Sequence, residues 1–184
     1  MVVLQEFYTT KDKEYITSAL QDIYPYTAEV DTWYHKHGVI VLSSLPIMKD
    51  RCGNSKFYSL KIGGTTIIPI HFNSFSPRKR LAQTNALLTV VQKLALHHVC
   101  VVGDTNLWDI AGKKKFIFKS DRDTYNLLTK YFIDCTREIG SATKVGLGFD
   151  KIFVSPDISF LHARCIRHTL KYMDHFPVFA EINT

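Results

Sequence analysis

The sequence contains no long hydrophobic run, and this absence argues against a membrane-spanning helix and a secretory signal. Its 184 residues hold no apolar stretch near the roughly 18 residues that a membrane-spanning helix needs. At the N-terminus, Met1 is followed by three apolar residues and then by the polar pair Gln5 and Glu6, so the segment lacks the apolar core of a secretory signal. We therefore expect a protein without a membrane span that lies inside the cell, in the cytoplasm or nucleus.

Cysteine is scarce, and segments that would divide the chain are absent. The four cysteines stand far apart at positions 52, 100, 135 and 165, and we expect reduced thiols in a reducing compartment. The chain shows no internal repeat, no low-complexity tract and no linker rich in Pro, Gly or Ser. Residues 1–184 are therefore expected to form a single domain, in line with about 150 residues per domain.

The composition is that of a folded protein with a modest positive charge. Hydrophobic residues make up 46% of the chain and charged residues 22%, which excludes a disordered protein because apolar surface is available for a core. The formal net charge of +6 fits a polyanionic partner but also fits many ordinary proteins. Charge alone does not identify the partner.

Short, β-rich apolar runs alternate with a few helical patterns. Apolar residues at steps of seven, three and four predict an amphipathic helix within 78–98. Two more helices are expected after Thr9 and over 121–131. This mixture favours a layered α/β or α+β fold with a site at one rim. The expected strands cover 2–4, 39–42, 57–62, 66–72, 99–102, 149–154 and 177–182.

Five of these strand ends carry acidic, amide or imidazole groups that folding does not require. Singly, each has a structural explanation, because an Asp after a strand often caps a turn and a His flanked by apolar residues often lies satisfied in the core. Together they supply what metal-assisted phosphodiester hydrolysis needs, namely carboxylates for a divalent ion and for water, and donors for phosphate charge. The residues are Glu6, His71, Asn73, Asp104, Asn106, Asp150, Asp174 and His175.

The motifs that contain these residues resemble a known superfamily. They are LQE at 4–6, LSSLPI at 42–47, IPIHFNS at 68–74, GDTN at 103–106, FDKIFVS at 149–155 and DHFPV at 174–178. In this order they are similar to the endonuclease/exonuclease/phosphatase superfamily, over essentially the whole chain. The resemblance implies a four-layer sandwich of two mixed β-sheets packed face to face, with helices outside. It also implies hydrolysis of phosphoester bonds in nucleic acid, DNA or RNA, with Mg²⁺ or Mn²⁺ as the cofactor.

The resemblance assigns roles to the acidic and amide residues. It implies that Glu6 binds the metal and that Asp174 lies near it. Asp104 would activate the attacking water, and Asn106 beside it would bind the phosphate.

The resemblance also assigns roles to the histidines and suggests one for two residues of a single helix. Asp150 is expected to orient His175, and His71 to contact the scissile phosphate or the leaving group. Arg80 and Gln83 match an Arg-x-x-Gln pattern on the helix after the His71 strand, for which we favour a structural role between helix and sheet.

Within the superfamily, GDTNLWD and HFNS look most like the tyrosyl-DNA phosphodiesterase 2 group, whose members release a tyrosine from a 5′ phosphate. The sequence departs from the usual pattern at three positions. Trp108 stands where a basic residue is expected, Met173 where Ser is usual, and Ser44 where Arg is common.

Further candidates for substrate binding follow the GDTN motif. Lys113, Lys114 and Lys115 are candidates for contact with a nucleic-acid backbone, although an ordinary solvated loop explains them equally well. Trp108 is a candidate for stacking on a base, with packing under the loop as the alternative. Asn73 completes this expected substrate-binding set.

The resemblance also leaves one expected element unmatched. Members normally begin with a strand that carries a Trp-Asn or Asn-x-Asn motif and with a helix, both before the LQE strand, whereas here LQE starts at Leu4. We therefore expect a domain that lacks its first strand and helix. We also expect a monomer. Two functions stay open: a metal-dependent phosphodiesterase, which the later motifs favour, and a catalytically inactive remnant that at most binds nucleic acid, which the missing strand favours.

Overall fold

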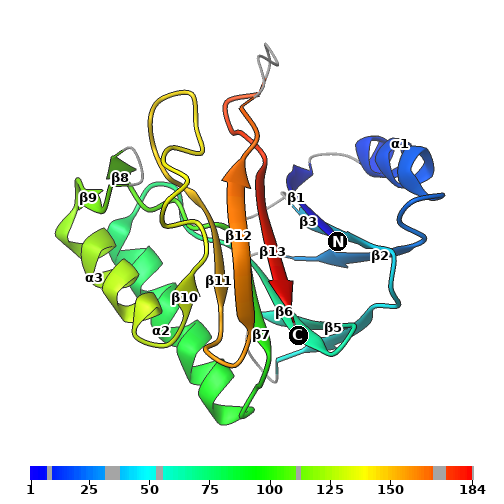
Figure 1. Ribbon diagram of the computed structural model, residues 1–184, viewed down its shortest axis with the longest axis horizontal. Helices are drawn as coiled ribbons and strands as arrows, with labels where there is room; N and C mark the ends of the chain where they lie inside the picture. Colours follow the sequence, from blue (N-terminus) through cyan, green and yellow to red (C-terminus); the bar gives the residue numbers. More distant parts are fainter. Residues whose placement is uncertain (8–9, 32–37, 53–55, 111–112, 168–172, 184) are drawn as a thin grey trace.

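The chain folds around one six-stranded mixed sheet, as the computed structural model in Figure 1 shows. Its strand order is β10-β11-β7-β6-β5-β4. β6 and β7 pair in parallel, joined by helix α2 (Pro77–Lys93), and the other pairs are antiparallel. The strands are β4 (Met48–Arg51), β5 (Tyr58–Ile62), β6 (Thr65–His71), β7 (Val99–Asp104), β10 (Ile133–Asp134) and β11 (Asp150–Val154). The structure describes all residues except 8–9, 32–37, 53–55, 111–112, 168–172 and 184.

A second β layer covers one face of this sheet and consists of two pieces. One is the antiparallel sheet β1-β3-β2, formed by β1 (Val2–Phe7), β3 (Gly38–Ser43) and β2 (Tyr26–Val30). The other is the antiparallel hairpin of β12 (Ser159–Cys165) and β13 (Val178–Asn183). Within the described residues, no strand pairs one piece with the other.

Helices α2 and α3 (Lys119–Thr129) cover the opposite face of the central sheet (Figure 1). Helix α1 (Thr10–Leu20) lies beside the three-stranded sheet, where Lys13 forms an ion pair with Glu29 of β2. A small hairpin of β8 (Asp109–Ile110) and β9 (Lys115–Phe116) precedes α3. None of the described helices is long and apolar enough to cross a membrane.

Two hydrophobic cores result, one on each face of the central sheet. Leu87, Val101 and Phe153 belong to the core beneath α2 and α3. Val41 and Ile67 belong to the core between the two β layers. The predicted sandwich of two β layers with helices outside is thereby confirmed.

Candidate active site

Strand pairing places three of the predicted site residues in one row. The parallel register of β6 and β7 sets His71 opposite Asp104, and the antiparallel register of β11 and β7 sets Asp150 opposite the same Asp104. Neighbouring residues of paired strands lie roughly 5 Å apart. The three side chains, distant in sequence, are therefore neighbours at one rim of the central sheet.

Glu6 joins this row from the second β layer. Its Oε1 lies 3.8 Å from Nε2 of His71, and the same Nε2 lies 3.9 Å from Oδ2 of Asp104. Glu6 has a left-handed backbone conformation, with φ +59°, at the end of β1. Such a conformation is unfavourable for a residue other than glycine and is held by its surroundings. His71 is buried, whereas Glu6 is about half exposed, with a side-chain exposure of 52%.

A hydrogen bond from Gln5 holds the end of β1 against the central sheet. Nε2 of Gln5 donates to the carbonyl oxygen of Ile70, at 3.0 Å. Gly103 makes room for it, because a Cβ at this position would lie 2.2 Å from Nε2 of Gln5 and 2.0 Å from the Ile70 oxygen. The φ of Gly103, +141°, is also one that other residues rarely adopt. Both residues stand in motifs quoted above, but sequence reasoning assigned neither a role.

His175 is held by Asp150, as the resemblance implies. Its Nδ1 lies 2.7 Å from Oδ2 of Asp150. Burial favours the neutral imidazole, but the hydrogen bond and the charge of Asp150, with further contributions from Asp104 and Asp174, raise the pKa of His175 to about 9. The imidazole is therefore a cation at neutral pH and can donate from Nε2 to an anionic group.

Asp104 lies at the centre of the site and is 6% exposed. Burial raises the pKa of its carboxyl to about 7, and the nearby charge of Asp150 acts in the same direction, while His175 opposes both. A carboxylate with a pKa near neutrality is well matched to accept a proton from water.

Asn106 forms a tight turn after Asp104. Its backbone N–H donates to Oδ1 of Asp104, at 2.6 Å, and its side-chain Nδ2 donates to the carbonyl of Phe72, at 3.0 Å. Asn106 is buried and has φ +50°. The hydrogen bond to Phe72 fixes the orientation of the Asn106 amide beside Asp104.

Asp174 is exposed and lies beside the row rather than in it. Its backbone carbonyl accepts from the N–H of Lys144, at 2.9 Å, and His175 forms an isolated β-bridge with Thr143. Together with Glu6, Asp104 and Asp150, it lines a cleft of about 1070 Å³. The structure therefore gathers all the predicted acidic residues at this cleft.

The predicted substrate-binding residues lie further from the row. Oδ1 of Asn73 accepts from the N–H groups of Phe75 and Ser76, at 3.1 and 2.7 Å, so it shapes the turn before α2. Trp108 is half-buried between Phe118 and Phe149, with ring centroids 5.8 and 6.1 Å away, an arrangement typical of packing under the loop.

The three lysines are exposed on the hairpin of β8 and β9. Lys113, Lys114 and Lys115 project from the turn and its second strand, and none of them lies among the residues that line the cleft. Their contact with a nucleic-acid backbone stays a prediction.

Arg80 and Gln83 have the structural role predicted for them. Arg80 is fully buried, and its Nε and Nη2 donate to both carboxylate oxygens of Asp121, at 2.8 and 2.7 Å. Its Nη1 donates to the carbonyl of Asn73, at 2.9 Å, and Oε1 of Gln83 accepts from the N–H of Asn73. These bonds fix α2 to the start of α3 and to the loop that follows His71.

A buried charged cluster behind the row was not predicted. Nζ of Lys151 lies 3.4 Å from Oδ2 of Asp109 and 3.8 Å from Oδ2 of Asp134, and all three side chains are at most 3% exposed. The hydroxyl of Tyr125 donates to the same oxygen of Asp134, at 2.9 Å. Because Lys151 follows Asp150 in β11, this cluster anchors the strand that carries Asp150.

The chemistry of the site fits a hard divalent cation. Mg²⁺ binds oxygen ligands, needs one or two carboxylates and keeps several waters. Glu6 and Asp174 both line the cleft and carry carboxylates of the kind that Mg²⁺ binds. Among the described residues, no group of three or more His, Cys, Asp or Glu side chains is arranged to hold a metal by itself.

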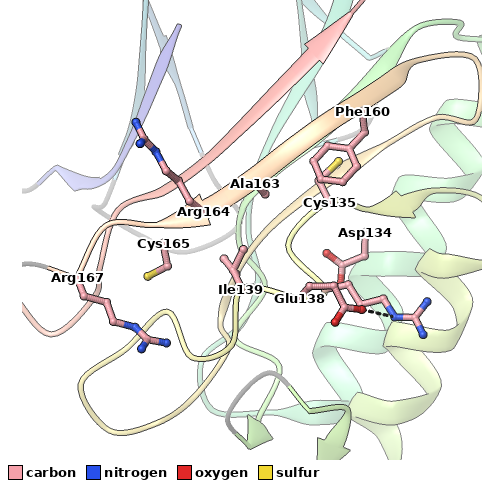
Figure 2. A pocket seen from close by; sticks show the side chains of 10 residues that line it. Asp134, Cys135, Glu138, Ile139, Phe160, Ala163, Arg164, Cys165 and Arg167 are labelled. Carbon is pink, nitrogen blue, oxygen red and sulfur yellow. Dashed lines mark ion pairs between the residues drawn. The ribbon is translucent and has the colours of Figure 1, made fainter.

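A second hollow lies away from this cleft, and Figure 2 shows the side chains around it. It measures about 610 Å³ and lies between residues 134–139 and β12, with Arg167 at one side. None of the residues predicted for the active site lines it.

Comparison with solved structures shows the same fold in several nucleases and phosphatases, although no family model and no curated protein matches the sequence. The 3′ phosphatase NExo from Neisseria, solved with a product DNA hairpin, has 20% identity and a TM-score of 0.74, and the match covers 99% of this chain and 88% of that one. An AP endonuclease from Archaeoglobus fulgidus has 17% identity and a TM-score of 0.72, with the same coverage.

A third similar structure is TDP2 from D. rerio, solved with a single-strand DNA product. It has 15% identity and a TM-score of 0.63, and the match covers 100% of this chain and 85% of that one. These likenesses show a shared fold. They confirm the prediction that the chain folds like the endonuclease/exonuclease/phosphatase proteins.

Proposed function

We propose that the protein is a metal-dependent phosphodiesterase that hydrolyses phosphoester bonds in nucleic acid. The observation that carries the proposal is the row His71, Asp104 and Asp150, with His175 hydrogen-bonded to Asp150 and Glu6 across from His71. A base, a cation and an acidic ligand thus face one cleft, as hydrolysis of a phosphate ester requires.

In this proposal each residue acts through the group that the structure exposes to the cleft. Asp104 accepts a proton from the attacking water through its carboxylate, whose pKa lies near 7. His175 donates from its imidazolium to a phosphate oxygen, and Asp150 keeps that ring charged and oriented. Glu6 and Asp174 would hold Mg²⁺ or Mn²⁺, which supplies Lewis-acid stabilisation of phosphate charge when bound.

His71 and Asn106 complete the surroundings of the phosphate. His71 lies within 4 Å of two carboxylates, Glu6 and Asp104, and would donate from Nε2 to the leaving group. Asn106 offers its amide beside Asp104. Both roles follow the resemblance described above and are supported by the position of these side chains at the same rim.

A more specific activity is release of a tyrosine from a 5′ phosphate. GDTNLWD and HFNS support it, together with the likeness in fold to TDP2. The departures at Ser44, Trp108 and Met173 weigh against it. The likeness to a 3′ phosphatase and an AP endonuclease makes 3′-phosphate and abasic-site ends the competing substrates.

The proposal is tested by hydrolysis assays on a panel of substrates with Mg²⁺, with Mn²⁺ and with EDTA. The panel contains single-stranded DNA, RNA, a 5′-phosphotyrosyl oligonucleotide, a 3′-phosphorylated oligonucleotide, an abasic duplex and an inositol polyphosphate. We expect product from at least one nucleic-acid substrate with metal, and none with EDTA.

Matched variants distinguish hydrolysis at this site from the activity of a contaminating nuclease. Asp104→Asn and His175→Asn should each lower the rate at least about 100-fold, whereas Asp22→Asn, an exposed carboxylate outside the site, should leave it unchanged. Full activity in Asp104→Asn would refute the assignment. Absence of metal-dependent product from every substrate would favour an inactive remnant that at most binds nucleic acid.

A further inference from the structure

We propose that a basic surface at the first turns of α2 and α3 binds the phosphate backbone of a nucleic-acid strand that leaves the cleft. This helix-start surface consists of Arg78 and Lys79 of α2 and of Lys119 and Arg122 of α3. Its role rests on the proposed function, because the bound strand is the one that is hydrolysed. The surface specifies the substrate further, as a strand of several nucleotides and not a small phosphate ester.

The strand topology places the start of α2 at the rim that carries the row of His71, Asp104 and Asp150. β6 and β7 are parallel and α2 joins them, so α2 begins at the rim where both strands end. His71 is the last residue of β6, and Asp104 is the last residue of β7. His71 and Pro77, the first residue of α2, are six positions apart in the chain, so they lie at most about 20 Å from each other.

A buried ion pair holds the start of α3 beside the start of α2. Arg80 of α2 donates to both carboxylate oxygens of Asp121, the third residue of α3, at 2.8 and 2.7 Å. Oδ2 of Asp121 also accepts from the N–H of Trp108, at 3.1 Å, directly before the β8–β9 hairpin. Side chains in the first turn of a helix are tilted toward its N-terminus. The four basic side chains are therefore directed toward one end of the helix layer, and Figure 1 shows both helices beginning on the side of this hairpin.

The positive charge of this end of the molecule is exposed and unbalanced. The two helix starts and the hairpin contain three acidic residues, of which Asp109 and Asp121 are buried in ion pairs and Asp123 is half-buried. Seven exposed cations exceed Asp123 by six charges, which equals the formal net charge of the whole chain. Within the part of the chain that the structure describes, none of the seven belongs to an ion pair. They are Arg78, Lys79, Lys113, Lys114, Lys115, Lys119 and Arg122.

A polyanion fits this surface better than a small anion does. None of the seven cations lines the cleft or the second hollow, so they do not enclose a small ligand. The phosphates of one strand of B-form DNA are spaced about 3.4 Å apart along the axis, so about six nucleotides span the distance of about 20 Å from His71 to the helix starts. Phosphate contacts position a strand without reading its bases. The expected ligand is therefore a strand with at least about six nucleotides on one side of the scissile bond, bound without base preference.

The test is fluorescence anisotropy with labelled single-stranded DNA of about 4 and about 16 nucleotides, measured in EDTA so that binding is observed without hydrolysis. The parent should bind the longer strand at least about tenfold more tightly. Lys79→Gln combined with Lys119→Gln should remove most of this difference. It should also lower the slope of log Kd against log salt by about 1.4, because each phosphate contact on a single strand contributes about 0.7.

Lys93→Gln combined with Lys130→Gln is the matched control. It removes the same two charges from the same two helices, but at their opposite ends, where both lysines are exposed. This control should bind both strands like the parent, and circular dichroism checks that each variant is folded. Equal losses of affinity in the two double variants would refute the proposal, because they would show that net charge and not the helix-start surface governs binding.

The binding measurement distinguishes failure of this surface from failure of the proposed function. Hydrolysis without length-dependent binding would overturn the surface and leave the proposed function intact. Length-dependent binding that requires Lys79 and Lys119, without cleavage of any substrate in the panel, would overturn the proposed function and support the surface. Binding of vesicles that contain phosphatidylserine, lost in the Lys79→Gln and Lys119→Gln variant, without binding of DNA, would overturn the surface in favour of a membrane contact.

Discussion

The Nδ1 atom of His175 lies 2.7 Å from the carboxylate of Asp150, and Asp150 is paired in register with Asp104 across β11 and β7. The expected base and the expected cation are thus linked through one carboxylate. Asp150 favours the charged imidazole of His175 and at the same time helps to raise the pKa of Asp104. Asp150 therefore contributes to the pKa of both residues, in addition to the burial that acts on each of them.

Replacing Asp150 by Asn should uncouple this arrangement. The pKa of His175 should fall from about 9, because the charge of Asp150 is lost and only a neutral amide oxygen is left to accept from the ring. Hydrolysis should fall about 100-fold or more, because the donor to the phosphate is then neutral and less well oriented. An NMR titration of the His175 ring and the hydrolysis rate measure the two effects.

A surface pair provides the control for this variant. His98 and Asp157 form an ion pair at 3.7 Å, with side chains 44% and 38% exposed. Asp157→Asn should leave both the His175 titration and the hydrolysis rate unchanged. An unchanged His175 titration in Asp150→Asn would contradict the assigned pair.

Stability should depend on pH through His175. Its folded pKa of about 9 lies above the ordinary 6.5, so the protonated ring stabilises the fold fully below about pH 6.5 and loses that contribution as the pH rises through 9. Because a third of the side chain is exposed, solvent screening reduces the effect to about 1–2 kcal/mol.

The measurement is urea denaturation of the parent and of His175→Asn at about pH 7 and about pH 10. The parent should exceed the variant in free energy of unfolding at the lower pH, and this advantage should shrink by about 1–2 kcal/mol at the higher pH. A difference that stays constant or grows with pH would show that the ring is not held as a cation.

Loss of Arg80 should destabilise the fold strongly. Arg80→Met leaves the carboxylate of Asp121 buried without its bidentate partner, which typically costs about 3–5 kcal/mol. Arg122→Met, one residue beyond Asp121 and exposed, should cost less than about 0.5 kcal/mol. Chemical denaturation measures both, and similar losses for the two variants would refute the role of the buried pair.

The sequence predicts most of the fold because the core strands are short apolar runs. The strands that escape prediction carry polar side chains, as in β4 (MKDR), whose four residues are all exposed and which exists because it pairs with β5. The helix expected over 78–98 ends earlier, at Lys93. Leu94 caps it, and Ala95 and His98 have positive φ, which a helical pattern in the sequence does not reveal.

The same reasoning explains which parts of the site could be predicted. Polar residues after apolar strands are visible in the sequence, and the structure brings Glu6, His71, Asp104, Asp150 and His175 to one rim. The contacts that support them are not visible, because each joins residues far apart in sequence. Lys151 meets Asp109 across 42 positions, and Gln5 meets Ile70 across 65.

Replacing Gly103 should destabilise the fold more than replacing Gly64, because an added Cβ meets other atoms only at Gly103. An added Cβ would lie 2.0 Å from the Ile70 oxygen and would displace the Gln5 amide, so Gly103→Ala should destabilise the fold by about 2–4 kcal/mol. Gly64 also has positive φ, +89°, but an added Cβ there meets nothing within 4 Å, so Gly64→Ala should cost only about 1 kcal/mol.

Because Gln5 precedes Glu6, Gly103→Ala should also lower hydrolysis in the fraction that stays folded, whereas Gly64→Ala should not. Denaturation curves and rates per folded molecule measure both effects, and equal costs for the two variants would show that backbone conformation alone, and not the close approach of Gln5, makes Gly103 necessary.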